Sequence, residues 1–354
     1  MSLLDQRQEP GPEGPPIRVL LISDGRPGHF RQSEGVVAAI ERRRPVALDR
    51  LQLVPRVPLA KGLVTRLGRV LPPPRYLSWL YGLDANQLEK PDMIVSTAGT
   101  TIGANVSLAR IWGVPNVFCG STRGYPLKRF HLVLTPYASV AQPPKIVAAP
   151  KPGPFNPEGI PPPRPLRSLE DFRDARISLL IGGPTPYSHF ASQDWSRLAD
   201  LVETLVSERG CFVTIVTSRR TPDEAYEKLM PLVKRPGGGV SVIDYRIKGA
   251  GSIEASFDCD LILVTSDSMS MMTEAALSRR PAIALAPRKV GPHRDDEAVA
   301  GFVAAKRLRV LPLASTDAAA LAAATLALEP STENYLDPLA DIVLTATGLR
   351  APAV

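Results

Sequence analysis

The 354-residue sequence has little of what builds disulfide frameworks, metal clusters or membrane spans. Its three cysteines are odd in number and widely spaced, which indicates small buried side chains rather than a disulfide or metal cluster. It has no run of about 20 apolar residues, so no transmembrane helix is expected. Residues 1–16 are polar and rich in Pro, Gly and Glu, without the apolar core of a secretory signal. We therefore expect a disordered N-terminal tail on a cytoplasmic protein.

Hydrophobic residues make up 44% of the sequence and charged residues 22%, which excludes a disordered or fibrous protein. Proline is abundant, and ten of the 37 prolines lie between residues 142 and 165. Because proline fits neither helix interiors nor central strands, this stretch predicts a stiff connector. We expect an N-terminal domain over residues 17–150, a Pro-rich linker over 151–175 and a C-terminal domain over 176–354, each domain of ordinary size.

Short apolar runs rich in β-branched residues alternate with helical patterns in both halves of the chain. Such alternation is typical of parallel sheets that are covered by helices on both faces. We predict two doubly wound, Rossmann-like α/β domains, in which ligands bind beyond the carboxyl ends of the strands. The expected strands are 17–23, 46–54, 93–96, 116–119, 131–135, 177–181, 212–217, 240–243, 261–265 and 282–286. The expected helices are 32–43, 59–71, 102–112, 195–209, 222–232, 268–278 and 317–328.

The formal net charge of +7 comes from the first 150 residues, which hold 19 Lys and Arg against 10 Asp and Glu, whereas the remainder holds 23 against 25. Residues 50–83 contain six basic residues and no acidic one, with leucines at helical spacing followed by aromatic residues. This pattern is typical of an interfacial helix on an anionic membrane, and an internal helix with a solvated polar face is the alternative. Nucleic acid is not expected as a partner, because no nucleic-acid-binding motif is present.

The loop after the first expected strand reads DGRPGH over residues 24–29. His29 and Asp24 project at the carboxyl end of that strand, where a histidine can act as a general base and a carboxylate can orient it. The alternative is that His29 only caps or packs the turn. The two glycines do not match the dinucleotide-binding pattern G-x-G-x-x-G.

Three loops of the second half carry groups that bind anions. Paired glycines at 182 and 183 let backbone amides approach a phosphate, and two arginines in the segment 218–222 lie beside a helix N-terminus. An ordinary turn and a solvated charge pair are the alternatives. In the segment 264–278, an apolar strand ends in hydroxylated residues, and a helix begins with Ser268 or Asp267 as its N-cap, an end that can hold a diphosphate.

Glu274 follows one to two turns into that helix, where its carboxylate can accept hydrogen bonds from both hydroxyls of a ribose; a solvated helix carboxylate is the alternative. At least two of the three methionines in this segment are expected in the core. The residues predicted to bind a nucleotide diphosphate are Gly182, Gly183, Ser218, Arg219, Arg220, Ser266, Ser268, Met269, Ser270 and Glu274.

These segments together resemble the mitochondrial-fission Elm-type family, a branch of proteins similar to the GT-B glycosyltransferases. The resemblance rests on DGRPGH with Gln32-Ser33, IGG at 181–183, SRRTP at 218–222, and VTSDSMSM at 264–271 followed by Glu274-Ala275. It implies two Rossmann-like domains that face each other across a cleft. It also implies transfer of a sugar from a nucleotide-diphospho-sugar, expected to be UDP-linked, to a membrane-associated lipid or glycan acceptor, with no metal or other cofactor.

The resemblance also implies roles for single residues. The His29 turn is similar to the histidine-containing glycine turn of the transferase that adds N-acetylglucosamine to the peptidoglycan lipid carrier. Gly182 and Gly183 are similar to its diphosphate-binding turn, and Glu274 to its ribose-binding glutamate. Two segments depart from the family pattern, at 135–139 and around 249–253. A nucleotide-sugar epimerase of the same fold and a non-catalytic, membrane-associated adaptor therefore remain as alternatives.

Overall fold

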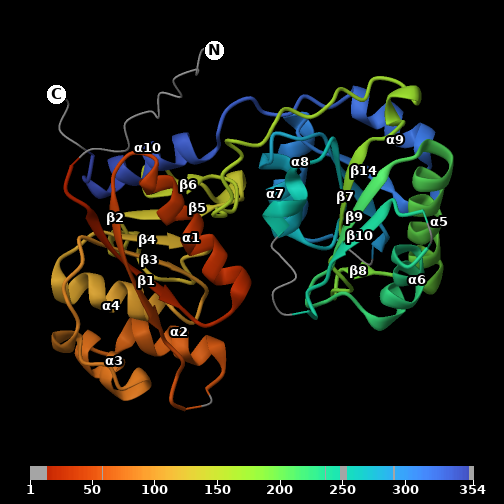
Figure 1. The fold of residues 1–354 in the computed structure, drawn as a ribbon. Coiled ribbons are helices and arrows are strands. Elements are labelled where there is room, and N and C mark those ends of the chain that lie inside the picture. The colour runs from red at the N-terminus through yellow and green to blue at the C-terminus, as the bar shows by residue number, and fades with distance from the viewer. Residues whose placement is uncertain (1–13, 58, 236, 248–252, 290–291, 351–354) are drawn as a thin grey trace, which may run out of the picture. The chain divides into compact units, whose positions relative to one another are not determined.

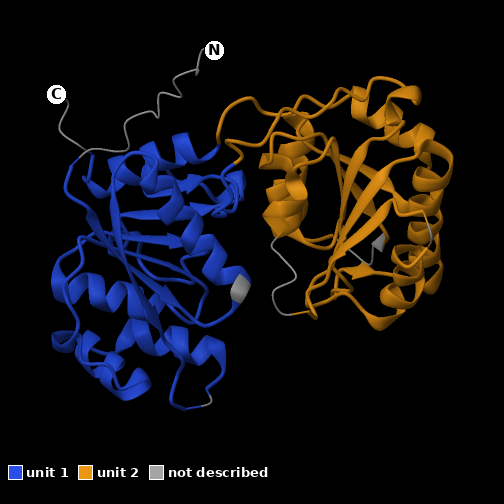
Figure 2. Ribbon diagram, viewed as in Figure 1, with its two compact units in different colours: residues 1–156, 335–354 blue, residues 157–334 orange. Residues whose placement is uncertain are grey.

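The computed structural model describes residues 14–57, 59–235, 237–247, 253–289 and 292–350. The chain forms two compact units (Figure 2): unit 1 consists of Met1–Asn156 with Tyr335–Val354, and unit 2 of Pro157–Asn334. Most of the expected N-terminal tail, residues 1–13, lies outside the described residues, as does most of the segment around 249–253.

Unit 1 is built on a parallel six-stranded sheet with the strand order β2-β1-β3-β4-β5-β6 (Figure 1). Its strands are β1 (Ile17–Ser23), β2 (Val46–Gln52), β3 (Met93–Thr97), β4 (Asn116–Cys119), β5 (Leu132–Thr135) and β6 (Ile146–Ala148). Its helices are α1 (Pro27–Glu41), α2 (Lys61–Val70), α3 (Pro73–Tyr81), α4 (Ile102–Trp112) and α10 (Leu336–Thr347). The two strands at the ends of this order, β2 and β6, each have one neighbour.

Successive residues of β1 face opposite sides of this sheet. Val19 and Leu21 pack in a core that includes α1 and α10, whereas Leu20 and Ile22 pack in a second core that includes α3 and α4. Because both faces are covered, the strand reads as a continuous apolar run. The predicted doubly wound arrangement is confirmed for this unit.

The end of the chain does not belong to the unit in which the sequence placed it. The prediction of one C-terminal domain over residues 176–354 is wrong for residues 335–354, which complete unit 1. The reason is the apolar face of α10, because Leu336, Leu339 and Val343 are buried together with residues of α1 and of the sheet. The Tyr335 hydroxyl donates a hydrogen bond to the Phe155 carbonyl at 3.0 Å, which fixes the start of this helix.

Unit 2 contains a second parallel six-stranded sheet with the order β10-β9-β7-β11-β12-β14. Its strands are β7 (Arg176–Leu180), β9 (Phe212–Val216), β10 (Val240–Ile243), β11 (Leu261–Thr265), β12 (Ala282–Ala286) and β14 (Arg309–Pro312), with a separate antiparallel pair β8 (Ser188–His189) and β13 (Arg288–Lys289). Its helices are α5 (Ser192–Arg209), α6 (Asp223–Val233), α7 (Met269–Leu277), α8 (Asp295–Ala304) and α9 (Ala318–Leu326). Helices α5, α6 and α9 share the core of one face, and α7 packs against β11 and β12.

The Pro-rich segment, predicted as a stiff linker over residues 151–175, is divided between the two units. Its first six residues belong to unit 1 and the rest to unit 2. Leu166 and Phe172 are buried in the core of unit 2, and the backbone N–H of Arg164 donates to the carboxylate of Asp260 at 2.9 Å. Both of these apolar side chains follow Pro165, the last proline of the segment.

None of the helices in the described parts of the chain combines the length and the hydropathy that a bilayer span requires.

Candidate functional site

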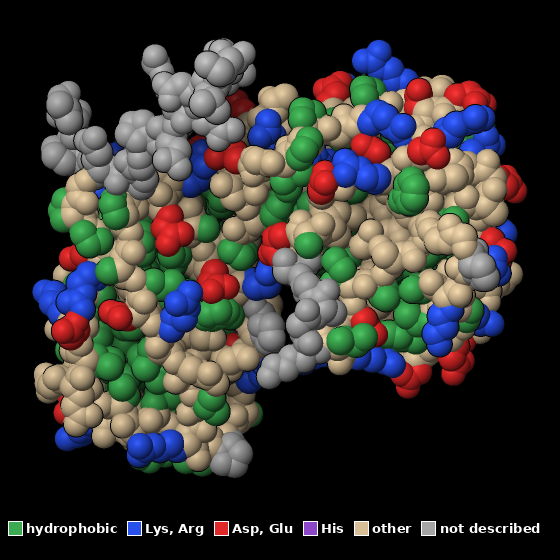
Figure 3. Space-filling view, in the orientation of Figure 1, with side chains coloured by type: hydrophobic (Ala, Val, Ile, Leu, Met, Phe, Trp, Pro, Cys, Tyr) green, Lys and Arg blue, Asp and Glu red, His purple; other side chains and the backbone are tan. Residues whose placement is uncertain are grey.

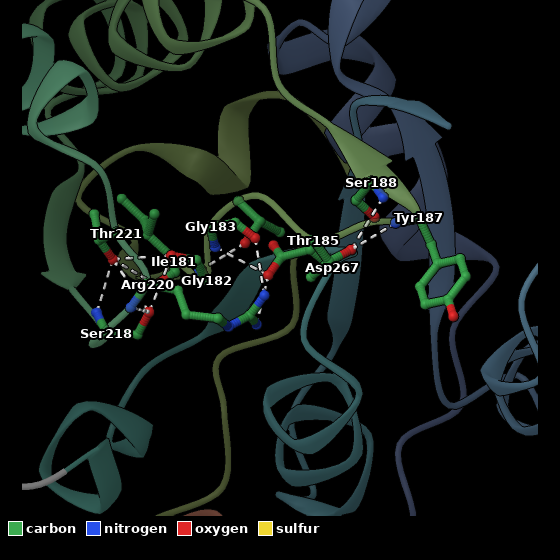
Figure 4. Close-up of polar contacts among 11 residues, drawn as sticks. Ile181, Gly182, Gly183, Thr185, Tyr187, Ser188, Ser218, Arg220, Thr221 and Asp267 are labelled. Carbon is green, nitrogen blue, oxygen red and sulfur yellow. Dashed lines mark hydrogen bonds and ion pairs between the residues drawn. The ribbon is translucent and has the colours of Figure 1, made fainter. Parts of the chain in front are cut away.

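Three loops of unit 2 meet at the carboxyl edge of its sheet. They follow β7, β9 and β11, which are neighbours in the strand order, and they carry Gly182–Gly183, Ser218–Thr221 and Ser266–Ser268 (Figure 4). The topology therefore brings together the segments in which the sequence predicted most of the diphosphate-binding residues.

Hydroxyl groups tie the loop after β9 to the glycine turn after β7. The Ser218 hydroxyl donates to the carbonyl of Gly182 at 3.0 Å, and the Thr221 hydroxyl lies 3.0 Å from the same carbonyl oxygen. The Thr221 hydroxyl also accepts from the backbone N–H of Ser218 at 2.8 Å. The backbone N–H of Gly182 donates to Thr265 Oγ1 at 2.8 Å, which joins the turn to the end of β11.

A buried carboxylate, that of Asp267, contacts the glycine turn. Its Oδ2 atom accepts from the backbone N–H of Gly183 at 2.9 Å and lies 2.7 Å from Nη2 of Arg220. Arg220 also donates through Nη1 to the carbonyl of Gly183 at 2.9 Å. The Asp267 side chain is 0% exposed and that of Arg220 is 34% exposed. Burial raises the pKa of Asp267, and hydrogen bonds and the Arg220 charge oppose this shift.

The backbone amides of the glycine turn are thus not available in the way the sequence predicted. Both N–H groups already donate to side chains of this chain, Thr265 and Asp267. Arg220 pairs with the Asp267 carboxylate, so an internal anion already balances its charge. Arg219 is exposed. The Thr221 hydroxyl donates to the glycine turn, and the next helix, α6, begins at Asp223 with Pro222 as its N-cap.

Close packing explains the two glycines. A Cβ atom on Gly182 would lie 2.1 Å from Oδ2 of Asp267, and one on Gly183 would lie 1.9 Å from the backbone oxygen of Arg220. Real Cβ atoms essentially never approach other atoms this closely. The paired glycines therefore allow three loops to meet, in addition to any role in binding a ligand.

The N-terminus of α7 retains open hydrogen-bond donors. Its N-cap is Ser268, whose side chain makes no capping hydrogen bond. Within the described parts of the chain, the backbone N–H groups of Met269, Ser270 and Met271 donate to no protein group. Unpaired amides at a helix N-terminus attract anions through their partial positive charge.

The side chains of this helix divide between the core and the surface. Met269 and Met272 are buried, as the sequence predicted for two of the three methionines. Ser270 is exposed, and Ser266 and Glu274 are half-buried. The side chain of Met269 is therefore part of the core, and its backbone N–H group is at the open end of the helix.

A second candidate site lies in unit 1, at the carboxyl end of β1. Helix α1 begins at Pro27, so the prediction of a start near residues 31–33 is wrong, because proline occupies the first turn and His29 is already helical. His29 Nδ1 lies 3.1 Å from both carboxylate oxygens of Asp24. The Thr100 hydroxyl donates to Asp24 Oδ2 at 3.0 Å. The structure thus brings the predicted histidine and carboxylate together.

Among the described residues, only one ring nitrogen of His29, Nδ1, has a hydrogen-bond partner. With the proton on Nδ1 facing Asp24, Nε2 is an acceptor, and the ring is half-buried. Sequence reasoning did not identify Thr100, although it follows β3, the neighbour of β1, and so lies at the same sheet edge.

Comparisons with known proteins agree with this architecture. The family model of Mitochondrial fission ELM1 matches residues 27–342. None of the curated proteins compared with the sequence matches it significantly. A solved structure of UDP-GlcNAc 2-epimerase from Methanocaldococcus jannaschii is similar at 13% identity and a TM-score of 0.54, covering 94% of this chain and 100% of that one.

Two further structures are similar at 14% identity. The S. aureus MnaA–UDP co-structure has a TM-score of 0.52 and covers 94% of this chain and 97% of that one. The structure of Acinetobacter baumannii MurG has a TM-score of 0.49, and the match covers 95% of this chain and 96% of that one. At such identities a likeness shows only the fold. The fold is of the GT-B kind, with two Rossmann-like units, and the chain belongs to the mitochondrial fission ELM1 family.

Proposed function

We propose that this protein is a glycosyltransferase that moves a sugar from a nucleotide-diphospho-sugar to a lipid or glycan acceptor at a membrane surface. The observation that carries the proposal is the pair of Asp24 and His29, whose geometry fits a general base that removes a proton from an acceptor hydroxyl. The S. aureus MnaA structure, which is a complex with UDP, supports UDP as the nucleotide to test first.

In the proposed reaction, the acceptor oxygen attacks the anomeric carbon of the donor sugar while its proton passes to His29 Nε2. The bond from the anomeric carbon to the diphosphate oxygen breaks, and the diphosphate leaves with the electron pair. We assign the stabilisation of its charge to the free amides at the start of α7, with Arg219 and Arg220 as nearby cations. Asp24 holds the ring and stabilises the imidazolium that forms.

The other predicted contacts complete the nucleotide site. Glu274 lies on α7 and is assigned to the ribose hydroxyls, and Ser266, Ser268 and Ser270 supply hydroxyls or amides near the diphosphate. Ser218 supports the glycine turn through the carbonyl of Gly182. No step of the proposal is assigned to a metal ion or another cofactor.

The membrane part of the proposal rests on α2 and α3, which both pack on α4. The outward face of α2 carries Leu63, Arg66 and Val70, and that of α3 carries Arg75 and Trp79. The exposed fractions are 44% for Leu63, 74% for Val70 and 54% for Trp79. Figure 3 shows apolar and basic side chains next to one another on this part of unit 1. Large apolar side chains among arginines suit the interface of an anionic bilayer.

A transfer assay tests the reaction. Labelled UDP-sugars are incubated with the protein and a lipid extract, and product is followed for the wild type and for His29→Ala, Asp24→Asn and Glu274→Ala. We expect His29→Ala to lose turnover by about a hundredfold or more while binding UDP normally, and Glu274→Ala to bind UDP more weakly. His131→Ala is the matched control. His131 precedes β5 and so lies at the amino edge of the sheet, whereas His29 lies at the carboxyl edge. Equal turnover by His29→Ala and the wild type would reject the assigned base.

The same assay separates the alternatives. Isomerisation of the donor sugar without any acceptor would identify an epimerase. Absence of binding to every nucleotide-sugar, measured by thermal shift, would identify a non-catalytic adaptor.

Vesicle sedimentation tests the membrane surface. Phosphatidylglycerol vesicles are expected to bind Arg66→Glu/Arg75→Glu at least about tenfold more weakly than the wild type, since each basic residue contributes about 1 kcal/mol. Lys228→Glu/Arg167→Glu makes the same change of net charge at exposed positions of unit 2 and is expected to bind normally. Equal losses for the two double variants would contradict a specific surface.

A further inference from the structure

The contacts of Asp267 are strongly unequal between its two carboxylate oxygens. Oδ2 receives the N–H of Gly183 and lies against Nη2 of Arg220. Oδ1 is buried and has no hydrogen-bond partner among the described residues. A carboxylate that binds an arginine and a buried amide through one oxygen alone is incompletely compensated for its loss of water.

The groups that hold Oδ2 are those that bind phosphate in proteins. A backbone N–H in a glycine turn and a guanidinium are both strong donors to phosphate oxygens. The side chain that fills this place belongs to Asp267, the residue just before Ser268, which is the N-cap of α7. The first N–H groups of α7 donate to no acceptor among the described residues. Asp267 thus occupies donors of the glycine turn and of Arg220 (Figure 4), and it directly precedes the N-cap of α7 in the sequence.

We propose that Asp267 is an internal counter-ion that competes with the diphosphate of the ligand for Arg220 and for the backbone amide of Gly183. This inference rests on the proposed nucleotide site and adds its regulation. In the unliganded protein the carboxylate holds the arginine and the turn. When a diphosphate binds, Arg220 leaves Oδ2 and pairs with a phosphate oxygen. Arg220 can make this move because a third of its side chain reaches solvent.

The structure also favours an exchange over a permanent pair. The buried carboxylate is held at some cost, since burial raises the pKa of Asp267 and no described residue donates to Oδ1. The alternative is a fixed support, in which Asp267 keeps the loops in place and the ligand meets only α7. The two alternatives predict opposite effects when the carboxylate charge is removed.

Calorimetry on the full-length protein distinguishes them, with inorganic pyrophosphate and UDP as the probes. Asp267→Asn keeps the size of the side chain and removes the competing charge. We expect it to bind pyrophosphate at least about tenfold more tightly than the wild type, because a like charge next to the ligand is lost and Arg220 is released. Unchanged or weaker binding would overturn the inference.

The matched control is Asp258→Asn. It removes one negative charge from unit 2 at an exposed carboxylate that pairs with Arg176, the first residue of β7, at the opposite edge of the sheet. Its affinity for pyrophosphate is expected to equal that of the wild type. A gain as large as that of Asp267→Asn would show a general effect of net charge and would also overturn the inference.

A measurement on the wild type covers the case in which Asp267→Asn does not fold. Phenylglyoxal modifies accessible arginines, and its reaction at Arg220 is mapped by mass spectrometry with and without pyrophosphate. We expect pyrophosphate to slow modification of Arg220 at least about fivefold, because the arginine pairs with the ligand. No protection would overturn the inference.

The inference and the proposed function fail in different ways. If the wild type transfers sugar but Asp267→Asn gains no affinity, only the competition by Asp267 is wrong. If Asp267→Asn gains affinity for pyrophosphate and the wild type turns over no nucleotide-sugar, only the proposed function is wrong.

Discussion

Arg42 and Asp337, which lie 295 positions apart in the sequence, form a two-point ion pair. Arg42 Nε lies 2.8 Å from Asp337 Oδ1, and Nη2 lies 3.1 Å from Oδ2. Arg42 follows the last turn of α1 and Asp337 is in the first turn of α10, so each charge also suits the dipole of its own helix. The pair joins the last helix of the chain to the first.

The first prediction concerns the pH dependence of this pair. The hydrogen bond from Arg42 holds the pKa of Asp337 below its ordinary value of 3.8. A carboxyl with a lowered folded-state pKa stabilises the fold above its unfolded-state pKa and loses this effect as pH falls through the folded-state pKa. We expect Asp337→Asn to reduce the free energy of unfolding by about 1 kcal/mol at pH 7. In urea titrations, the difference in the free energy of unfolding between the wild type and Asp337→Asn should shrink below about pH 4. A difference that does not depend on pH would contradict this role of the ion pair.

The second prediction concerns the apolar face of α10. Leu339 is buried in the core of unit 1, so Leu339→Ala is expected to lower the free energy of unfolding by about 2–4 kcal/mol. The control is Leu326→Ala on α9, where the side chain is 62% exposed and the expected change is below about 0.5 kcal/mol. Equal effects in chemical denaturation would mean that α10 is not part of the unit 1 core.

The third prediction concerns the glycine turn. Gly183→Ala places a Cβ against the backbone oxygen of Arg220, so the loops must separate, and we expect a loss of about 1–3 kcal/mol in stability. Gly301→Ala on α8 meets no atom within 4 Å and should be neutral or stabilising by up to about 1 kcal/mol. Thermal unfolding of the two variants measures the contrast, and similar melting temperatures would refute the close packing.

The fourth prediction concerns the three cysteines, which are all buried and free. Burial raises the pKa of Cys119 to about 12 and those of Cys211 and Cys259 to about 11. Because the thiolate is the reactive form, we expect no rapid reaction with a disulfide reagent at pH 8 in the native protein. All three thiols should react in denaturant, and Ser207→Cys at an exposed position of α5 should react at once. Rapid labelling of any native cysteine would contradict their burial.

Strands were predictable where both faces of the sheet are covered. The expected strands 116–119, 261–265 and 282–286 agree with β4, β11 and β12 to the residue, and these strands are almost entirely buried. Strand β14 was missed because most of its residues, Arg309 and Val310 among them, are exposed. Such a strand lacks the continuous apolar run that marks a buried one.

Helix α10 shows what the sequence could not decide. Its apolar face fits any core of suitable shape, and only the packing against α1 selects unit 1. The same limit applies to the candidate site. The sequence located the loops at the carboxyl edge, yet it offered Asp267 only as a possible N-cap. The contacts of Asp267 with Gly183 and Arg220 join loops that follow different strands, and no local sequence pattern reveals such contacts.

The return of α10 to unit 1 has a consequence for synthesis of the protein. Unit 2 is one continuous segment, whereas unit 1 is assembled from residues on both sides of it. Unit 1 lacks Leu336, Leu339 and Val343 until the segment that follows unit 2 has been made. The half of the protein that carries His29 therefore matures last, and a nascent chain stalled before residue 335 would present its uncovered apolar sheet face to chaperones.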